Sequence, residues 1–281
     1  MGIYTNRESL LASLLPWRNS KKIGFVPTMG ALHQGHLTLV DKAVKENDCV
    51  VVSIFVNPTQ FNNSEDLEKY PRNLDADVAL LNSLHKNIIV YAPEISDIYG
   101  DKITATAYDF LGLEHEMEGK HREGHFNGVG TILNILFRII KPDNAYFGEK
   151  DFQQLQIVKK LVEIENLPVS IVGVPIVREE SGLAMSSRNN RLTEKQQKEA
   201  VLISKTLKEV KEQFSSHTIS ELNRFVKETF EKNDQLALEY FEIANEKTLK
   251  TAVEKSKNEK YRAFIAVFSG EIRLIDNMAL N

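Results

Sequence analysis

The sequence predicts an α/β protein in which a parallel β-sheet is covered by helices on both faces. Over residues 1–177, short apolar runs rich in β-branched residues alternate with stretches of helical periodicity. Such alternation is typical of a parallel sheet whose strands are joined by helices. Beyond residue 177 the alternation stops, and charged helical stretches precede further apolar runs. A length of 281 residues suits two domains, each with its own core.

The strands of the first domain, residues 1–177, are expected at the apolar runs. These cover residues 22–28, 49–56, 87–93 and 169–177, and a short strand within residues 144–151 leads into a loop. Helical periodicity predicts helices over residues 35–46, 74–84 and 152–168, and a long apolar helix that ends at Pro142. A parallel sheet with helices between its strands is a Rossmann-like arrangement.

The second domain, residues 178–281, begins with a polar, glycine-containing connection. Its expected elements are helices over residues 193–214 and 219–232 and a strand over residues 238–244. The last two apolar runs, residues 261–268 and 272–276, flank a Ser-Gly-Glu turn that contains Gly270, which predicts a β-hairpin. We therefore expect a smaller α+β domain that acts as a lid.

The composition indicates a globular protein that binds neither nucleic acid nor membranes. A formal net charge of −4 disfavours a broad nucleic-acid-binding face, although a local basic pocket for a phosphorylated ligand is compatible with it. No apolar run reaches membrane-spanning length, and the N-terminal residues lack a secretory pattern. Cys49 is the only cysteine, so no intrachain disulfide can form. We expect a cytoplasmic protein.

The stretch GFVPTMGALHQGHLTLV, residues 24–40, joins the first long strand to a helix through a turn that contains Gly30 and Gly35. Free backbone N–H groups and the helix dipole at such a turn favour a bound anion. His33 and His36 share one face of the first helical turn, and each can donate a ring N–H to a phosphate oxygen. Because open α/β sheets bind ligands at the carboxyl ends of their strands, the motif predicts a phosphate-binding site.

Two other interpretations of the histidine pair stay open. The pair could form half of a metal site, but this region supplies no cysteine or carboxylate pair at a readable spacing. The imidazoles could also simply cap the helix.

Two further segments carry side chains suited to a nucleotide. In GEKD, residues 148–151, Lys150 can neutralise a phosphate, and Asp151 can accept hydrogen bonds from two ribose hydroxyls. In MSSR, residues 185–188, two hydroxyls and a guanidinium lie in the connection between the domains, where a loop could close over a triphosphate. Taken alone, each segment could equally be a solvated loop.

The side chains of Gln60 and Gln154 suit an acid substrate. A neutral amide can donate to a carboxylate and also accept from a hydroxyl. Alone, either glutamine could be a surface residue.

The H-x-G-H pattern at residues 33–36 resembles the histidine signature of the nucleotidyltransferase superfamily that includes class I aminoacyl-tRNA synthetases. The longer block PTMGALHQGH resembles the pantothenate synthetase (pantoate–β-alanine ligase) family. Further blocks follow in the family's order, namely SIFVNPTQF with YPRNLDAD, then YFGEKDFQQL, then GVPIVREESGLAMSSRNNRLT. The resemblance covers essentially the whole chain. It implies an ATP-dependent condensation of (R)-pantoate with β-alanine to pantothenate, through a pantoyl adenylate, with release of AMP and pyrophosphate.

The resemblance also implies the roles of individual residues. His36 would donate a proton to the transferring group, and His33 and Lys150 would be the other catalytic residues. Gln60, Gln154 and Asn57 would bind the acid substrates, and Gln60 would approach both pantoate and β-alanine. The residues implied in ATP binding are Met29, Gly30, Ala31, Leu32, His33, Gln34, Gly35, His36, Gly148, Glu149, Lys150, Asp151, Val177, Met185, Ser186, Ser187 and Arg188.

Mg²⁺ is implied as the ion that accompanies ATP, and family members form homodimers. The family's acidic position corresponds to Asp77, with Asp75 as an alternative ligand and the ATP phosphates as another. The chain departs from the family where relatives often have R-P-G-H-F, because Glu123 replaces the proline. The roles of Arg122 and His125 therefore stay open.

Two other functions are compatible with the motifs. An adenylyltransferase acting on a phosphorylated acceptor would need a second phosphate site, and no extra basic cluster flanks the histidine turn. A nucleotide sensor or an RNA-binding remnant of a synthetase would bind ATP without releasing pyrophosphate, but the net acidity argues against RNA.

Overall fold

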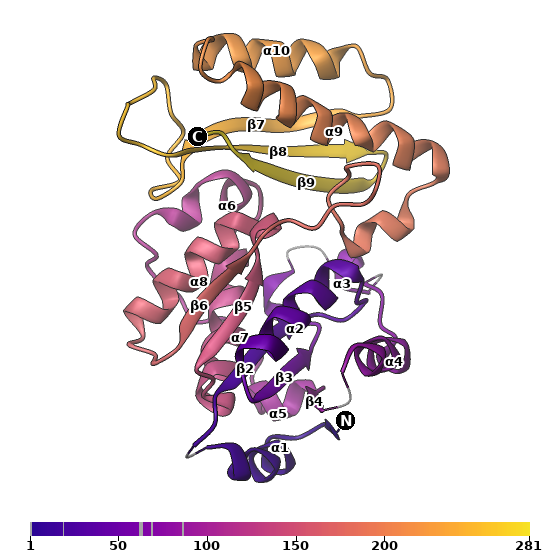
Figure 1. Cartoon of the computed structure of the whole chain (residues 1–281), viewed down its shortest axis with the longest axis vertical. Coiled ribbons are helices and arrows are strands. Elements are labelled where there is room, and N and C mark those ends of the chain that lie inside the picture. The colour runs from indigo at the N-terminus through magenta and orange to yellow at the C-terminus, as the bar shows by residue number, and fades with distance from the viewer. Residues whose placement is uncertain (1, 19, 62–63, 69, 86) are drawn as a thin grey trace.

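The chain builds two β-sheets, which lie one above the other in Figure 1. The computed structural model describes residues 2–18, 20–61, 64–68, 70–85 and 87–281. The lower sheet has six strands in the order β1-β4-β3-β2-β5-β6, and the upper sheet has three in the order β7-β8-β9. We call the parts of the chain around these sheets the N-terminal and C-terminal domains.

Every neighbouring pair in the six-stranded sheet is parallel, which confirms the predicted sheet. Its strands are β1 (Gly2–Tyr4), β2 (Ile23–Thr28), β3 (Cys49–Ile54), β4 (Ile88–Tyr91), β5 (Asn144–Gly148) and β6 (Ser170–Val174). β2, β3 and β4 are almost wholly buried, as expected for parallel strands that are covered on both faces.

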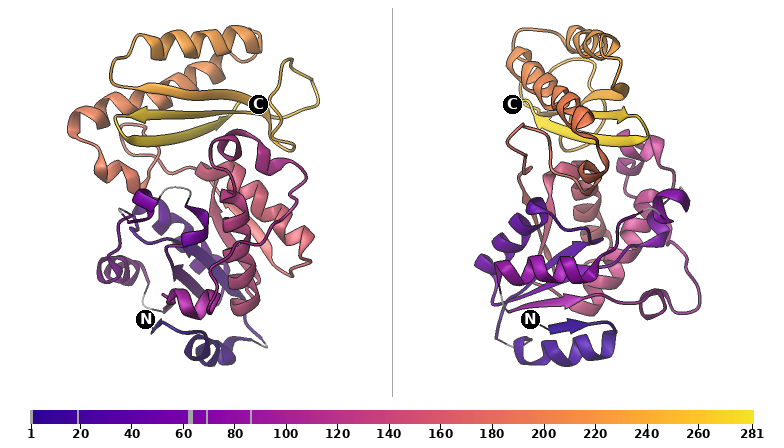
Figure 2. Two further views of the ribbon diagram at one scale, coloured as in Figure 1. Left: turned by 180° about the vertical axis from the view of Figure 1, so that it is seen from behind. Right: turned by 90° about the vertical axis from the view of Figure 1, so that its right-hand side faces the viewer.

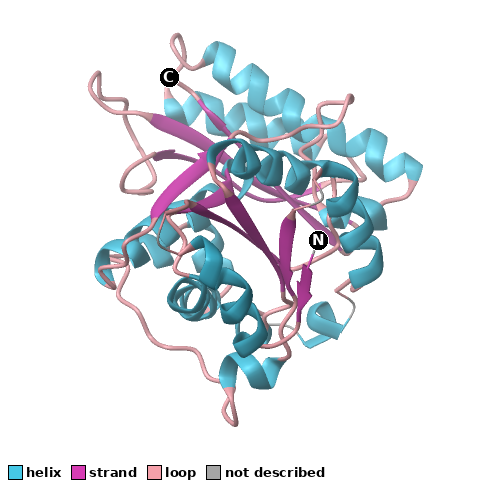
Figure 3. Cartoon of the chain, turned by 60° about the horizontal axis from the view of Figure 1, so that its bottom comes forward, coloured by secondary structure: helices cyan, strands magenta, loops and turns pink. Residues whose placement is uncertain are grey.

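Helices cover both faces of this sheet, as predicted (Figure 3). One face carries α1 (Arg7–Leu14), α7 (His125–Ile140) and α8 (Phe152–Ile164), and the other carries α2 (Gln34–Glu46) and α4 (Leu74–Leu84). Because successive side chains of a strand point to opposite faces, Phe25 of β2 belongs to the core on the α7 side, and Val26 belongs to the core on the α2 side. The short helices α3 (Ser64–Glu68), α5 (Ile95–Tyr99) and α6 (Met117–His121) lie in the connections.

The strand order reverses between β2 and β5. From β2 the chain adds β3 and then β4 on one side, and it returns to place β5 and β6 on the other side of β2. The register pairs Gly24 with Asn144 and Phe25 with Ala145, so both strands end at the same edge of the sheet. Loops diverge at such a switch point and leave a crevice where α/β proteins bind ligands. The segments that follow β2 and β5 are the predicted histidine turn and GEKD.

The C-terminal domain packs two helices on one face of an antiparallel sheet (Figure 2). Its elements are α9 (Glu194–Gln213), α10 (Ile219–Glu231), β7 (Ala237–Asn245), β8 (Tyr261–Ser269) and β9 (Ile272–Ala279). Ala263 and Ile265 pack with α9 and α10, whereas Phe264, between them on β8, packs against the N-terminal domain. The predicted hairpin is confirmed, with Gly270 in the turn at a φ of 60°.

The structure differs from the expected elements at several points. β1 and α1 were not predicted, because a strand of three residues and a weakly amphipathic helix of eight residues give little periodic signal. β6 is shorter than the expected strand at residues 169–177, and β9 continues to Ala279 through the polar pair Asp276 and Asn277. The boundary at 177/178 stays a prediction, and the first residue of the C-terminal core is Leu183. Within the residues described, no helix is both long and apolar enough to cross a membrane.

Candidate active site

A pocket of about 280 Å³ lies at the switch point and is lined by residues of both domains. The structure brings together there most of the predicted site residues. Those that line it are Met29, His33, Gly35, His36, Asn57, Gln60, Gly148, Lys150, Asp151, Gln154, Val177, Met185, Ser186, Ser187 and Arg188. Of the remaining predicted residues, Gly30, Ala31, Leu32, Gln34, Glu149 and Asp77 do not line it.

Each of the two histidines caps helix α2 through its own Nδ1 atom. His33 is the N-cap residue, and its Nδ1 accepts the N–H of Gly35 at 3.1 Å. Nδ1 of His36 accepts the N–H of His33 at 3.3 Å, which completes a capping box. The ring centroids lie 4.1 Å apart. Both rings therefore cap the helix, but the caps account for only one nitrogen of each ring.

The caps fix the protonation of the two rings. A neutral imidazole whose Nδ1 accepts a hydrogen bond carries its proton on Nε2. Burial, followed by the charge of Lys150, lowers the pKa of His33 to about 4. Burial, followed by the neighbouring His33 and by Lys150, lowers the pKa of His36 to about 3. At neutral pH both histidines line the pocket as neutral Nε2–H donors.

The carboxylate of Asp77 holds the loop before α2 through hydrogen bonds to its backbone. Gly30 and Ala31 both have positive φ angles, 81° and 50°, a conformation that is strained for alanine. The Asp77 carboxylate accepts the N–H of Ala31 at 3.0 Å and the N–H of Leu32 at 2.7 Å. It is 4% exposed. Asp77 therefore stabilises the left-handed bend.

These contacts change two expectations about the loop. The prediction that its N–H groups are free for an anion is wrong for Gly30, Ala31, Leu32, His33 and Gly35, which all donate within the protein. The Asp77 carboxylate does not fit a metal ligand well, because each oxygen already accepts a backbone N–H. Among the described residues, no group of three or more His, Cys, Asp or Glu side chains could hold a metal ion.

Gln60 is presented by a short turn that packs closely against α7. Asn57 Nδ2 donates to Gln60 Oε1 and to the carbonyl of Gly128, both at 3.1 Å. A Cβ at Gly128 would lie 2.2 Å from the carbonyl oxygen of Thr59, so only glycine allows this approach. Tyr99 also donates to Asn57 Oδ1. Asn57 thus orients Gln60 through contacts within the protein.

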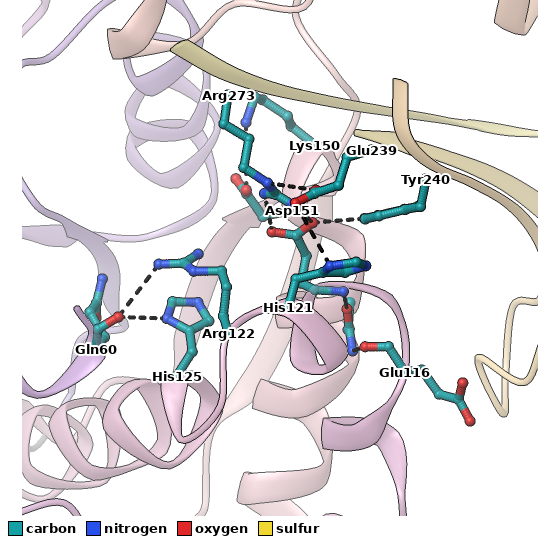
Figure 4. Close-up of polar contacts among 12 residues, drawn as sticks. Gln60, Glu116, His121, Arg122, His125, Lys150, Asp151, Glu239, Tyr240 and Arg273 are labelled. Carbon is teal, nitrogen blue, oxygen red and sulfur yellow. Dashed lines mark hydrogen bonds and ion pairs between the residues drawn. The ribbon is translucent and has the colours of Figure 1, made fainter. Parts of the chain in front are cut away.

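Arg122 and His125 hold the same turn from the other side (Figure 4). His125 Nδ1 lies 2.8 Å from the carbonyl oxygen of Gln60, and Arg122 Nη2 donates to that oxygen at 3.4 Å. Burial, with the nearby Arg122, lowers the pKa of His125 to about 4. The guanidinium of Arg122 therefore brings a positive charge to the lining of the pocket near Gln60.

The GEKD and MSSR segments meet the histidine turn across the pocket. GEKD forms a 3₁₀ turn, Glu149–Asp151, in which Lys150 Nζ lies 3.5 Å from Asp151 Oδ1. Ser187 Oγ donates at 3.2 Å to the carbonyl of Ala31, 156 positions earlier, and so ties MSSR to the loop before α2. The histidine turn follows β2, whereas GEKD and MSSR follow β5 and β6. Because these strands lie on the two sides of the switch point, the fold explains why the three segments meet here.

A partly buried ion pair joins the two domains beside the pocket. Arg273 of β9 donates from both Nη atoms to the Glu118 carboxylate at 2.7 and 2.8 Å, and Tyr240 donates to the same group at 2.7 Å. Figure 4 shows Arg273 and Tyr240 reaching from the C-terminal sheet toward the segment of His121 and Arg122. Burial raises the pKa of Glu118, but the hydrogen bonds and charge of Arg273 outweigh it and lower the pKa to about 2.

Several residues of the site left little trace in the sequence. Three residues of the C-terminal domain that contact the N-terminal domain were not predicted from the sequence, namely Arg273, Arg262 and Asn277. The one available signal was the polar pair Asp276 and Asn277 inside an apolar strand, because a buried polar residue in such a position usually has a partner.

A Rossmann-like sheet with two histidines, a lysine and hydroxyl groups around a pocket at its switch point defines an enzyme of the nucleotide-binding α/β class. The family model described as pantoate-beta-alanine ligase matches residues 2–279. The chain is 53% identical to the pantothenate synthetase of Christiangramia forsetii over 282 residues and 53% identical to that of Flavobacterium psychrophilum over 281, with 100% of each chain covered.

Solved structures agree with this assignment. The pantothenate synthetase of Thermus thermophilus matches with a TM-score of 0.91 at 37% identity, covering 100% of this chain and 99% of the other. The pantoate-beta-alanine ligase of Francisella tularensis, complexed with beta-gamma ATP and beta-alanine, matches with a TM-score of 0.83 at 38% identity, covering 100% and 98%. The chain belongs to the pantoate–β-alanine ligase family.

We predict that His33 and His36 are neutral Nε2–H tautomers at pH 6 in the free protein. Their lowered pKa values mean that the unfolded chain binds more protons below its pKa of 6.5, so stability falls as the pH drops from 6.5 toward 4. Side-chain ¹⁵N NMR, assigned with His33→Asn and His36→Asn, measures the tautomer directly. Imidazolium signals from either residue at pH 6 would contradict the prediction.

We also predict that Asp77→Asn weakens ATP binding when no metal is present. An amide at this position can accept only one of the two N–H groups, so the strained bend loses a hydrogen bond and the affinity for ATP falls roughly tenfold. Calorimetry in the presence of EDTA measures the affinity for ATP without metal. Asp75→Asn is the matched control, because Asp75 is exposed on the same helical turn. Unchanged metal-free binding, with a raised Mg²⁺ requirement, would instead make Asp77 a metal ligand.

Proposed function

We propose that the residues around this pocket carry out the two steps of the family reaction, with the roles given below. The reaction is the ATP-dependent condensation of pantoate with β-alanine, through a pantoyl adenylate. The observation that carries the assignment of roles is that His33, His36 and Lys150 line the same pocket as Gln60 and Gln154. Cationic and N–H groups suit the triphosphate, and amides suit a hydroxy acid.

In the first step, a carboxylate oxygen of pantoate attacks the α-phosphorus of ATP, and the bond to the pyrophosphate oxygen breaks. We assign the Nε2–H groups of His33 and His36, together with Lys150, to the charge that develops on the transferring group. Because the two rings are neutral at pH 7, His36 donates a hydrogen bond and does not begin as a full acid. Arg188 and the hydroxyls of Ser186 and Ser187 would bind the leaving pyrophosphate.

In the second step, the amine of β-alanine attacks the acyl carbon, AMP leaves, and the amine loses a proton as the amide forms. We assign the positioning of both acids to Gln60, and the support for this is that its turn is held by Asn57, Arg122 and His125. We assign the β-alanine carboxylate to the guanidinium of Arg122. The C-terminal domain covers the pocket and would protect the mixed anhydride from water.

Several further assignments belong to this proposal. The nucleotide would contact residues 29–36, 148–151 and 185–188 together with Val177, although only part of the first segment lines the pocket. Mg²⁺ would enter with ATP and be held chiefly by the phosphates, because the site offers no cluster of ligands among its described residues. A homodimer in the cytoplasm that binds no nucleic acid is the assembly we expect.

Turnover with purified protein tests the proposal. We expect AMP and pyrophosphate to form continuously only when ATP, Mg²⁺, pantoate and β-alanine are all present. His36→Ala should lower kcat by roughly a hundredfold or more because it removes a donor to the transferring group. Gln60→Ala should chiefly raise the KM for pantoate. Thr38→Ala is the control for the helix, because Thr38 lies on α2 and does not line the pocket.

Two outcomes would contradict it. Turnover with a phosphorylated acceptor in place of both acids would indicate an adenylyltransferase. ATP binding without any release of pyrophosphate would indicate a sensor.

A further inference from the structure

Asn277 of the C-terminal domain touches the backbone of the segment that carries Lys150. Its Nδ2 donates to the carbonyl of Glu149 at 2.9 Å and to the carbonyl of Lys150 at 2.8 Å. Asn277 is 2% exposed and lies on the face of β9 that is turned toward the N-terminal domain. One side chain from the lid therefore binds two successive peptide groups of the turn that presents the catalytic lysine.

The orientation of the Asn277 amide is fixed by Arg262. Nη1 of Arg262 donates to Oδ1 of Asn277 at 2.6 Å, which leaves Nδ2 as the end that faces the turn. Arg262 is itself held, because its Nε donates to Glu246 at 2.9 Å and its guanidinium lies 3.9 Å from the centroid of the Phe152 ring. Phe152 is the first residue of α8, directly after the turn. The contact thus has a rigid support on both sides.

Side-chain caps do not support the turn. Neither Gly148, at its start, nor Asp151, at the start of α8, makes a side-chain cap. A Cβ added at Gly148 would meet nothing closer than 4.0 Å, so side-chain packing does not fix the backbone there. The C-terminal domain reaches the turn through the two hydrogen bonds from Asn277 and through the ion pair between Arg262 Nη2 and Glu149 Oε2, 3.8 Å apart. Of these contacts, the bonds from Asn277 hold the backbone of the turn.

We propose that Asn277 is a positioning residue for Lys150. It orders the Glu149–Asp151 turn when the C-terminal domain is seated, so that closure of the lid and placement of the lysine occur together. The inference deepens the proposed function and rests on its assignment of Lys150 to the transferring group. A misplacement of about 1 Å in such a group can cost as much as a hundredfold in rate.

Two variants test the contact in different ways. Asn277→Asp keeps the shape and the bond from Arg262 but turns both donors into acceptors that repel the carbonyls. Asn277→Ala removes the donors without adding charge, which separates lost positioning from repulsion of ATP by a new carboxylate. Asn245→Asp is the matched control, because the Oδ1 of Asn245 accepts two backbone N–H groups that an aspartate would still satisfy.

The measurement is single-turnover formation of the adenylate from ATP and pantoate. We expect Asn277→Asp and Asn277→Ala to slow this step roughly tenfold to a hundredfold, with the KM for pantoate changed by less than about twofold. Asn245→Asp should match the wild-type protein. Thermal unfolding of each variant checks that the domain is folded at the assay temperature.

A double-mutant cycle with Lys150→Met distinguishes positioning from a general structural effect. If Asn277 acts through the lysine, Asn277→Ala should have little further effect once Lys150 is replaced. Full additivity of the two substitutions would overturn the inference. A wild-type rate for Asn277→Ala, with Lys150→Met inactive, would also overturn it. In both cases the proposed function would still stand. A wild-type rate for Lys150→Met would remove the assignment of Lys150 and the inference with it.

Discussion

The pocket depends above all on the partly buried ion pair between Glu118 and Arg273. These residues come from α6 and β9, and the fork geometry of two Nη–carboxylate bonds fixes both the distance and the orientation of the two domains. The N–H of Glu118 is also bound by Gln153 of α8, which extends the connection into the six-stranded sheet. Removing one partner of such a pair leaves the other charge partly withdrawn from water and without its counter-ion.

The residues that we assign to the reaction share one feature, which is that part of each residue holds the protein itself. The Nδ1 atoms of His33 and His36 cap α2, and this leaves Nε2–H for the ligand. The backbone carbonyl of Gln60 is hydrogen-bonded to His125, and Gln60 itself lines the pocket. Such internal partners fix the reactive groups before substrate arrives, so little reorganisation is needed in the transition state.

Local signals predicted the parallel sheet, the C-terminal hairpin and the histidine turn, and the family blocks located Lys150 and Gln60. The rest depends on contacts between residues distant in sequence, which a local pattern does not encode. Asp77 looked like a metal ligand because an acidic residue stands at that family position, whereas its backbone partners are visible only in the fold. Asn277 donates to the carbonyls of Glu149 and Lys150, which lie 128 and 127 positions earlier in the chain. No role was predicted for Gly128 from the sequence, and only the packing of α7 on the Gln60 turn shows why it has no side chain.

The central claim is that this pocket joins the pantoate carboxylate to the α-phosphorus of ATP. Pantoate labelled with ¹⁸O in both carboxylate oxygens tests it most directly, with mass spectrometry of the products after complete turnover. The account predicts one ¹⁸O in the phosphoryl group of AMP and one in the amide carbonyl of the product, because the bridging oxygen stays with AMP when the amine attacks carbon. Unlabelled AMP, with ¹⁸O in pyrophosphate or phosphate, would contradict it.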